Sequence, residues 1–331
     1  MPDGNLNSTP RLARGYAVAF VSALILSTTG ILIGYLTRTY GLPALVLAFW
    51  RDLFVMLSLL PVLGIVRPGL LRVERRHLAF LAGYGLALSL FNALWTLSVV
   101  LNGAAVATVL VYCSSAFTAL LGWRLLHERL DWARGLAVAV SLGGCVLVAG
   151  AYDPAVWRSN LPAILTGIVS GLLYAIYSLM GRTASQRGLN SWTTLLYTFG
   201  FASAFLLIYN FLPFKLPGAA TVPAEMLWLG DAWKGWGMLL LLAAGPTLVG
   251  FGLYNVSLSY LPSSLANLIV TLEPAFTVVL AYGLLGERLT TVQLGGSLLI
   301  LSAVVLLRIY EGRLESRSRS ARTGLKEAIS P

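Results

Sequence analysis

The sequence predicts an all-α integral membrane protein whose ten transmembrane helices form two inverted five-helix repeats. Three observations predict this fold class: the composition, a succession of long apolar segments, and one segment that occurs twice. Apolar residues make up 57% of the 331 residues and charged residues only 11%, whereas soluble domains contain about 45–50% and about 25%. The mean hydropathy is +0.80. Because a water-soluble core cannot accommodate this much apolar surface, the composition places the chain in a lipid bilayer.

Ten apolar segments follow one another along the chain, each long enough to cross about 30 Å of hydrocarbon as an α-helix. The first is longer than the apolar region of a secretory signal and is followed at once by another, so we expect it to be retained. The predicted spans are 15–37, 43–66, 78–100, 104–126, 133–151, 161–180, 191–212, 235–259, 263–285 and 291–309.

One segment of the chain occurs twice. Residues 104–130 and 263–289 align without a gap and match at about eleven of their 27 positions, including the runs Ala-Phe-Thr and Glu-Arg-Leu. A shared apolar composition alone does not produce this agreement, so the match indicates a duplication. It predicts a first five-helix repeat over 15–151 and a second over 161–309.

The basic residues predict the orientation. With the N-terminal segment 1–14 in the cytoplasm, 17 of the 23 Lys and Arg residues lie on the cytoplasmic side and five on the other side, with Arg51 inside a span. Such a bias sets the topology of membrane proteins. Both termini, including a disordered basic tail over 310–331, are therefore expected in the cytoplasm. Because five spans is an odd number, the two repeats run in opposite directions across the bilayer.

No motif in the sequence supports an enzymatic function. The chain has two His and two Cys residues and contains no HExxH, P-loop or GxSxG motif, so we expect no catalytic residue, metal site or cofactor. The topology explains the basic tail without a nucleic-acid partner. The expected partners are a small-molecule substrate and the lipid bilayer. The sequence leaves the oligomeric state open and is compatible with a monomer.

Several motifs carry a resemblance to a known family. They are the five-plus-five spans, the Phe-Trp-Arg element at 49–51, the Glu-Arg-Leu run after the fourth helix of each half, and Glu-Pro-Ala-Phe at 273–276. With these the chain resembles the EamA-type branch of the drug/metabolite transporter superfamily. The aromatic residues proposed below for the cavity are similar to those of the YddG-type amino-acid exporters.

The resemblance implies a secondary transporter of the bacterial inner membrane. It would export small organic metabolites, amino acids including aromatic ones, by alternating access around a cavity between the repeats. Three alternatives stay open: a triose-phosphate-like or nucleotide-sugar-like carrier, a carrier of cationic drugs with the same fold, and a channel-like facilitator.

The binding site is expected near the midplane, where the repeats meet and helices are interrupted at corresponding places. Gly83 and Gly85 in the third span, and Gly245 with Pro246 in the eighth, mark the predicted interruptions. Aromatic and small polar residues near them share helix faces and predict a chamber for an amphipathic solute. Helix packing or anchoring at the membrane interface is the alternative for each. The candidates are Tyr84, Asn92, Trp95, Tyr112, Ser115, Tyr174, Tyr177, Phe251, Tyr254, Asn267, Thr271 and Glu273.

Three ionisable residues lie inside predicted spans, where each requires a partner or water. Arg51 and Asp52 are about 100° apart around their helix and are therefore expected to face different neighbours. We predict structural roles for both, with contact to a substrate carboxylate as the alternative for Arg51. The proline that follows Glu273 leaves the carbonyl of Val270 without its helical donor. Glu273 itself is predicted to be a neutral structural hydrogen-bonder, a ligand for a substrate amine or a proton-coupling site.

Overall fold

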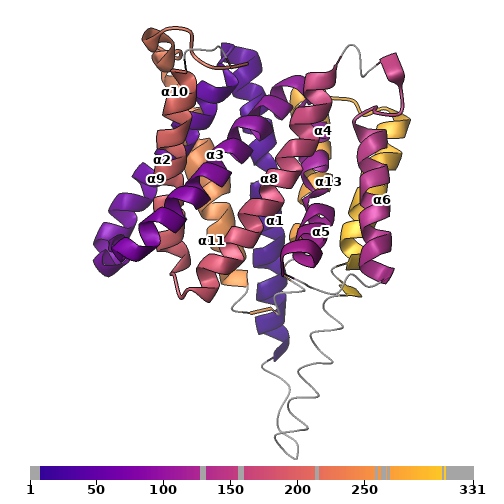
Figure 1. Cartoon of the computed structure of the whole chain (residues 1–331), viewed down its shortest axis with the longest axis horizontal. Helices are drawn as coiled ribbons and strands as arrows, with labels where there is room; N and C mark the ends of the chain where they lie inside the picture. Colours follow the sequence, from indigo (N-terminus) through magenta and orange to yellow (C-terminus); the bar gives the residue numbers. More distant parts are fainter. Residues whose placement is uncertain are drawn as a thin grey trace, which may run out of the picture.

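The computed structural model describes residues 8–126, 132–155, 160–212, 216–257, 260–261, 266, 269–307 and 309–310. Every regular element within these ranges is helical (Figure 1). Seven helices are long and apolar enough to cross a membrane, and three shorter apolar helices cover Gly135–Val148, Glu273–Leu285 and Thr291–Leu307. The prediction of an all-α membrane protein is confirmed for the described residues, whereas the count of ten spans stays a prediction.

The helix bounds follow the predicted spans, with breaks inside three of them. The elements are α1 Ser8–Tyr40, α2 Ala44–Val66, η1 Pro68–Leu71, α3 Arg75–Asn102, α4 Ala104–Val111, α5 Ser114–Leu126, α6 Trp132–Val148, α8 Leu161–Gln186, α9 Ser191–Asn210, η2 Pro223–Leu227, α10 Trp233–Leu242, η3 Ala243–Gly250, α11 Phe251–Ser257 and α13 Glu273–Leu285. The last apolar helix covers Thr291–Leu307.

The two copies of the repeated segment are broken at equivalent positions. A turn at 112–113 separates α4 from α5, and a turn at 271–272 precedes α13. The alignment of the copies pairs these two turns. Pro274, in the first turn of α13, accounts for the second break because it lacks an N–H and cannot continue a helix from the preceding residues. The first break has no proline, and the sequence did not predict it.

The interruptions predicted in the third and eighth spans have different outcomes. The prediction for the third span is wrong, because α3 is one continuous helix. Gly85 instead allows α9 to approach: a Cβ there would lie 3.0 Å from the carbonyl oxygen of Thr198. In the eighth span a π-helix, η3, contains Pro246 and joins α10 to α11, which confirms an irregular helix at this place.

Long-range contacts join several helix ends at one end of the bundle. The side chain of Arg38, near the end of α1, pairs with Glu287, which also accepts from the amide of Ala104 at the start of α4. Asn102, at the end of α3, donates to the carbonyl of Ala163 at the start of α8. We call this the upper end, as in Figure 1. The opposite, lower end contains the start of α1 and the turn between α8 and α9.

The connection between α9 and α10 covers the upper end. The amide of Leu45 donates to the carbonyl of Gly218 at 2.8 Å, and the indole of Trp50 donates to the carbonyl of Met226 at 2.6 Å. The ring of Trp50 also packs edge-on against Trp236, with 5.0 Å between centroids. This connection therefore seals the start of α2 and joins it to α10.

Two glycines hold α6 against the last helix, the pair at the right of Figure 1. A Cβ on Gly144 would lie 2.7 Å from the carbonyl oxygen of Gly296, and a Cβ on Gly296 would lie 2.8 Å from that of Gly144. Small residues that let helix backbones touch are typical of membrane helix pairs. Gly143, one position earlier, faces open space.

Gly144→Ala should lower the free energy of unfolding by about 1–3 kcal/mol relative to Gly143→Ala, because only the first methyl group meets the backbone of the neighbouring helix. Both variants change the helix propensity by the same amount, so Gly143→Ala is the matched control. Unfolding of the purified protein in mild detergent, followed by heat or by denaturant, measures the difference. Equal shifts in the two variants would contradict the close contact.

Candidate functional site

A cavity of about 670 Å³ lies between the two halves of the chain. This volume lies within the range of about 300–1,000 Å³ that is typical of small-molecule sites. Lining residues come from α1, α2, α3, α4, α5, α8, α9, η3, α11, the start of α13 and the last helix, Thr291–Leu307. They continue to Leu189 in the turn between α8 and α9, whereas Trp50, Ala104 and Glu287 at the upper end are not among them. The cavity therefore reaches the lower end of the bundle.

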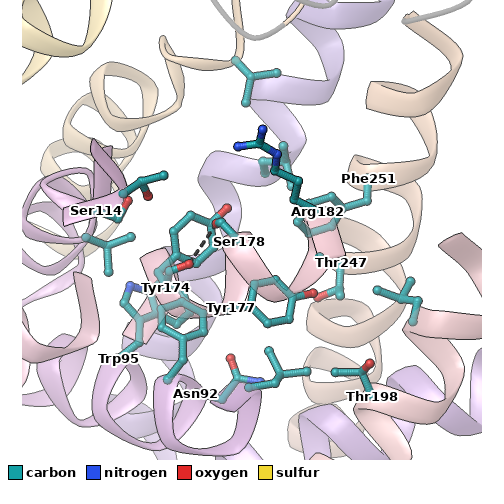
Figure 2. A pocket seen from close by; sticks show the side chains of 18 of the residues that line it. Asn92, Trp95, Ser114, Tyr174, Tyr177, Ser178, Arg182, Thr198, Thr247 and Phe251 are labelled. Carbon is teal, nitrogen blue, oxygen red and sulfur yellow. Dashed lines mark hydrogen bonds between the residues drawn. The ribbon is translucent and has the colours of Figure 1, made fainter. Parts of the chain in front are cut away.

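Aromatic side chains from α3 and α8 form one wall of the cavity. Tyr84 packs on Tyr177 with 4.8 Å between ring centroids, and Phe91 packs on Tyr174 at 5.1 Å. Trp95 continues the row, 6.2 Å from Phe91 and nearly parallel to it. Figure 2 shows Trp95, Tyr174 and Tyr177 facing the same space. The wall offers several ring faces on which an aromatic or aliphatic group can pack.

A buried charged cluster lies beside this wall. Asn92 donates to both carboxylate oxygens of Asp52, at 2.9 and 2.7 Å, and Nε of Arg51 donates to Asp52 at 3.2 Å. The guanidinium carbon of Arg51 lies 5.7 Å from the ring centroid of Trp95. Both charged residues thus contact α3, and the prediction that they face different neighbours is wrong. The long arginine side chain reaches across the 100° between them. Arg51 lines the cavity and Asp52 does not.

The two broken helices meet at Tyr112. Its hydroxyl lies 2.9 Å from a carboxylate oxygen of Glu273 and 3.3 Å from the carbonyl oxygen of Val270. That carbonyl is the one that Pro274 leaves without a helical donor. The sequence predicted that the carbonyl of Val270 lacks a helical donor. It did not predict the side chain that reaches this carbonyl, because Tyr112 lies in the other half of the chain.

The remaining predicted residues have three outcomes. Ser115, Phe251 and Thr271 line the cavity, and the hydroxyl of Ser115 donates to the carbonyl of Tyr112 at 3.1 Å. Tyr254 does not line the cavity but packs against a small apolar cluster formed by Ala19, Leu261 and Ala266. Asn267 lies outside the described residues.

The π-helix explains why Tyr254 does not line the cavity as predicted. A π turn contains more residues than an α turn, so it rotates the residues that follow it relative to a regular helix. The cavity is lined by Thr247, Phe251 and Asn255, four residues apart, whereas the sequence predicted Phe251 and Tyr254 on the cavity face. Asn255 thus takes the place expected for Tyr254.

Helix α9 contributes residues that sequence reasoning missed. Thr194 and Thr198 line the cavity and are buried, and Figure 2 shows Thr198 near Asn92. Their spacing of four residues places both hydroxyls on one helix face. A polar pair at this spacing in an apolar segment was the signal available in the sequence. Within the described part of the chain, no group of three or more His, Cys, Asp or Glu side chains could hold a metal ion.

Glu287 caps a helix at the upper end. Its two carboxylate oxygens accept from the amides of Ala104 and Ala105, each at 3.0 Å, and Arg38 donates to the same carboxylate. A carboxylate at a helix start satisfies free N–H groups and interacts favourably with the helix dipole. Gly103 has a φ of 84°, and a Cβ there would lie 2.9 Å from Glu287. The equivalent Glu128 lies outside the described residues.

These features define a multi-pass membrane protein with a small-molecule cavity between broken helices. Comparison with known proteins agrees: the model of the EamA-like transporter family matches residues 13–150 and again residues 161–309. The chain belongs to this family, which confirms the resemblance seen in the sequence, and it is a membrane transporter.

Relatives and solved structures agree with this assignment. An uncharacterized transporter of Archaeoglobus fulgidus is 28% identical over 298 residues, which cover 88% of this chain and 95% of that protein. An uncharacterized transporter of Synechocystis is 28% identical over 233 residues, covering 69% and 66%. A solved crystal structure with 17% identity superposes with a TM-score of 0.55 over 89% of this chain and 96% of that one; at this identity the likeness concerns the fold alone.

Tyr112→Phe should lower the free energy of unfolding by about 0.5–1.5 kcal/mol, because it removes the hydroxyl that lies against the carbonyl of Val270 and the carboxyl group of Glu273. Tyr209→Phe is the matched control: its hydroxyl lies 3.0 Å from that of Ser89, and Ser89 already donates to a backbone carbonyl. Denaturation in detergent compares the two variants. A smaller loss for Tyr112→Phe than for Tyr209→Phe would contradict the link between the broken helices.

Proposed function

We propose that this transporter exports small organic metabolites, with amino acids including aromatic ones as substrates, by alternating access. The observation that carries the proposal is the cavity, which has an aromatic wall, a few polar groups and a lining that continues to Leu189 in the α8–α9 turn at the lower end. A solute with an apolar ring and a polar end matches this lining, since the ring packs on the wall while the polar end forms hydrogen bonds.

The two inverted five-helix repeats, 15–151 and 161–309, are part of this proposal. The family model matches the chain twice, over 13–150 and 161–309, and the turns at 112–113 and 271–272 break the duplicated segments at equivalent positions. Transporters with inverted repeats place the substrate between discontinuous helices and move one part of the fold against another. The seven long and three short apolar helices are compatible with ten spans.

The arginine bias supports a direction for the cavity. It assigns the lower end, with the α8–α9 turn, to the cytoplasm of a cell whose inner membrane contains the protein. The cavity would then be open to the cytoplasm and closed at the outer surface, where Glu287 holds the start of α4 beside Arg38. A substrate would enter from the cytoplasm, as export requires.

The charges of the lining favour amino acids over the alternative substrates. Among the described residues the lining contains two arginines, Arg51 and Arg182, and one carboxylate, Glu273. Arg51 already shares its charge with Asp52, so even with Arg182 the lining offers less than two full positive charges to a phosphate with two negative charges. Glu273 accepts from Tyr112 and keeps acceptors for the amine of an amino acid, whose carboxylate group a cationic drug lacks. A channel would need an opening at both ends.

Counterflow in proteoliposomes tests the proposal. The protein should exchange labelled phenylalanine and alanine across the membrane, and Trp95→Ala should reduce phenylalanine exchange roughly 2- to 12-fold more than alanine exchange, because aromatic packing contributes about 0.5–1.5 kcal/mol. Trp233→Ala changes an exposed tryptophan outside the cavity. It should leave the exchange of both phenylalanine and alanine unchanged. Absence of amino-acid exchange would reject the proposed substrates, and equal losses of both solutes would reject the aromatic wall as a substrate contact.

Glu287→Gln tests the closure of the upper end. The amide lacks the charge that pairs with Arg38 and binds helix N–H groups less strongly, so the upper end should open about 5- to 30-fold more often. A cysteine at Thr108, which lines the cavity below the start of α4, reports this opening in a background without native cysteines. A membrane-impermeant maleimide added on the upper side of sealed vesicles should react faster in the variant.

The matched control for this change is Glu225→Gln. Glu225 lies in the connection that covers the upper end and accepts from Thr221, outside the cavity lining. Its replacement should leave the labelling rate at Thr108 unchanged. An unchanged rate in Glu287→Gln would show that this carboxylate does not keep the upper end closed.

A further inference from the structure

We infer that Arg51 and Trp95 form an anion subsite at the upper limit of the cavity and bind the carboxylate of an arylalkyl monocarboxylate, aromatic amino acids included. The inference rests on the proposed function and names the substrate class of the same cavity. It assigns Arg51 a binding role, where the sequence favoured a structural one.

Two hydrogen-bond donors without partners carry the inference. Nη2 of Arg51 and Nε1 of Trp95 are buried and have no hydrogen-bond partner among the described residues. Both residues line the cavity, and their exposed fractions are 3% and 8%. A buried donor without an acceptor is costly, and a buried cation more so. A carboxylate at this end of the cavity would supply acceptors for both once the side-chain atoms that cover the two nitrogens move aside.

The guanidinium group is held in place from one side. Asp52, which does not line the cavity, accepts from Nε of Arg51 at 3.2 Å and is itself fixed by two hydrogen bonds from Asn92. Trp95 lies against the guanidinium group with 5.7 Å between the guanidinium carbon and the ring centroid. The terminal nitrogen is therefore oriented before a ligand arrives, which reduces the ordering that binding requires.

Hydroxyl groups extend the set of donors. The side-chain oxygens of Thr108 on α4 and of Thr194 and Thr198 on α9 are also buried without a partner among the described residues, and all three residues line the cavity. Five of the six buried side chains with such atoms thus line the cavity; the exception is Ser141. Among the described residues, the buried side-chain atoms without hydrogen-bond partners are therefore concentrated around the cavity, where a substrate would bind.

Charge and shape indicate the class of ligand. Arg51 and Asp52 together have no net charge, so the subsite favours one carboxylate over a doubly charged phosphate. The aromatic wall continues from Trp95 to Phe91 and then to Tyr174, with centroid distances of 6.2 and 5.1 Å. A ligand with its carboxylate at Arg51 would place a ring, attached through a short alkyl chain, against this wall.

Binding of two matched solutes tests the subsite. The probes are 3-phenylpropionate, which has a carboxylate and no amine, and phenylalaninamide, which has an amine and no carboxylate. The wild-type protein in detergent should bind 3-phenylpropionate about 10- to 100-fold more tightly, as expected for hydrogen bonds to charged groups. Arg51→Gln combined with Asp52→Asn should abolish this preference. The double change removes both charges at once and leaves no unpaired buried carboxylate.

Two further variants keep the test decisive. Arg76→Gln, at an exposed arginine outside the cavity, should keep the wild-type preference. Trp95→Phe keeps an aromatic ring but removes the N–H donor, and it should weaken binding of 3-phenylpropionate about 2- to 10-fold while leaving phenylalaninamide unchanged. This variant decides the matter if the double variant does not fold.

The outcomes separate this inference from the proposed function. Exchange of phenylalanine by the wild-type protein without a preference for 3-phenylpropionate would overturn the subsite and leave the proposed function standing. A preference that survives in the double variant, or is unchanged in Trp95→Phe, would also overturn it. Failure to exchange phenylalanine and to bind either probe would reject the proposed function and the subsite together.

Discussion

The need to satisfy every backbone polar group inside the membrane is the constraint on which this structure depends. Regular helices satisfy their own N–H and C=O groups, but a broken helix does not, and hydrocarbon offers no partner. Tyr112 and Thr271, one residue from each break at 112–113 and 271–272, line the cavity between the halves. Tyr112 donates toward the carbonyl that Pro274 leaves free. The side chain that compensates one break thus comes from the other break, which links the two halves at the cavity.

The same constraint governs the charged residues. A charge within a membrane span needs a partner or a polar cavity. Asp52 has Arg51 and Asn92, and Glu287 at the upper end has Arg38 and two helix amides. The outside of the helix bundle, by contrast, carries exposed apolar residues such as Val279, Leu284 and Leu298. Polar groups are therefore concentrated in the interior, and the cavity that a transporter requires forms where they meet.

The cavity residues show how far local spacing can predict a site. The face of α3 with Tyr84, Phe91 and Trp95 follows from regular helical periodicity, and all three line the cavity. The same reasoning was wrong for Tyr254, because the π-helix before it changes the periodicity. It also missed the contribution of α9, where the spacing of Thr194 and Thr198 was the one signal and packing brings that helix to the cavity. A single local irregularity is enough to exchange one lining residue for its neighbour.

The sequence by itself determined the membrane environment, the helical fold, the family and the duplicated segment, because composition, segment length and short motifs are local properties. The tertiary structure decided which distant residues meet: Asn92 with Asp52, Tyr112 with Val270, and Glu287 with the start of α4. It also showed that Arg51 lines the cavity while its Nη2 is buried without a hydrogen-bond partner among the described residues. These contacts depend on how the helices cross and where they break. Helix crossing is set by side-chain packing across the whole bundle, which periodicity along one segment does not contain.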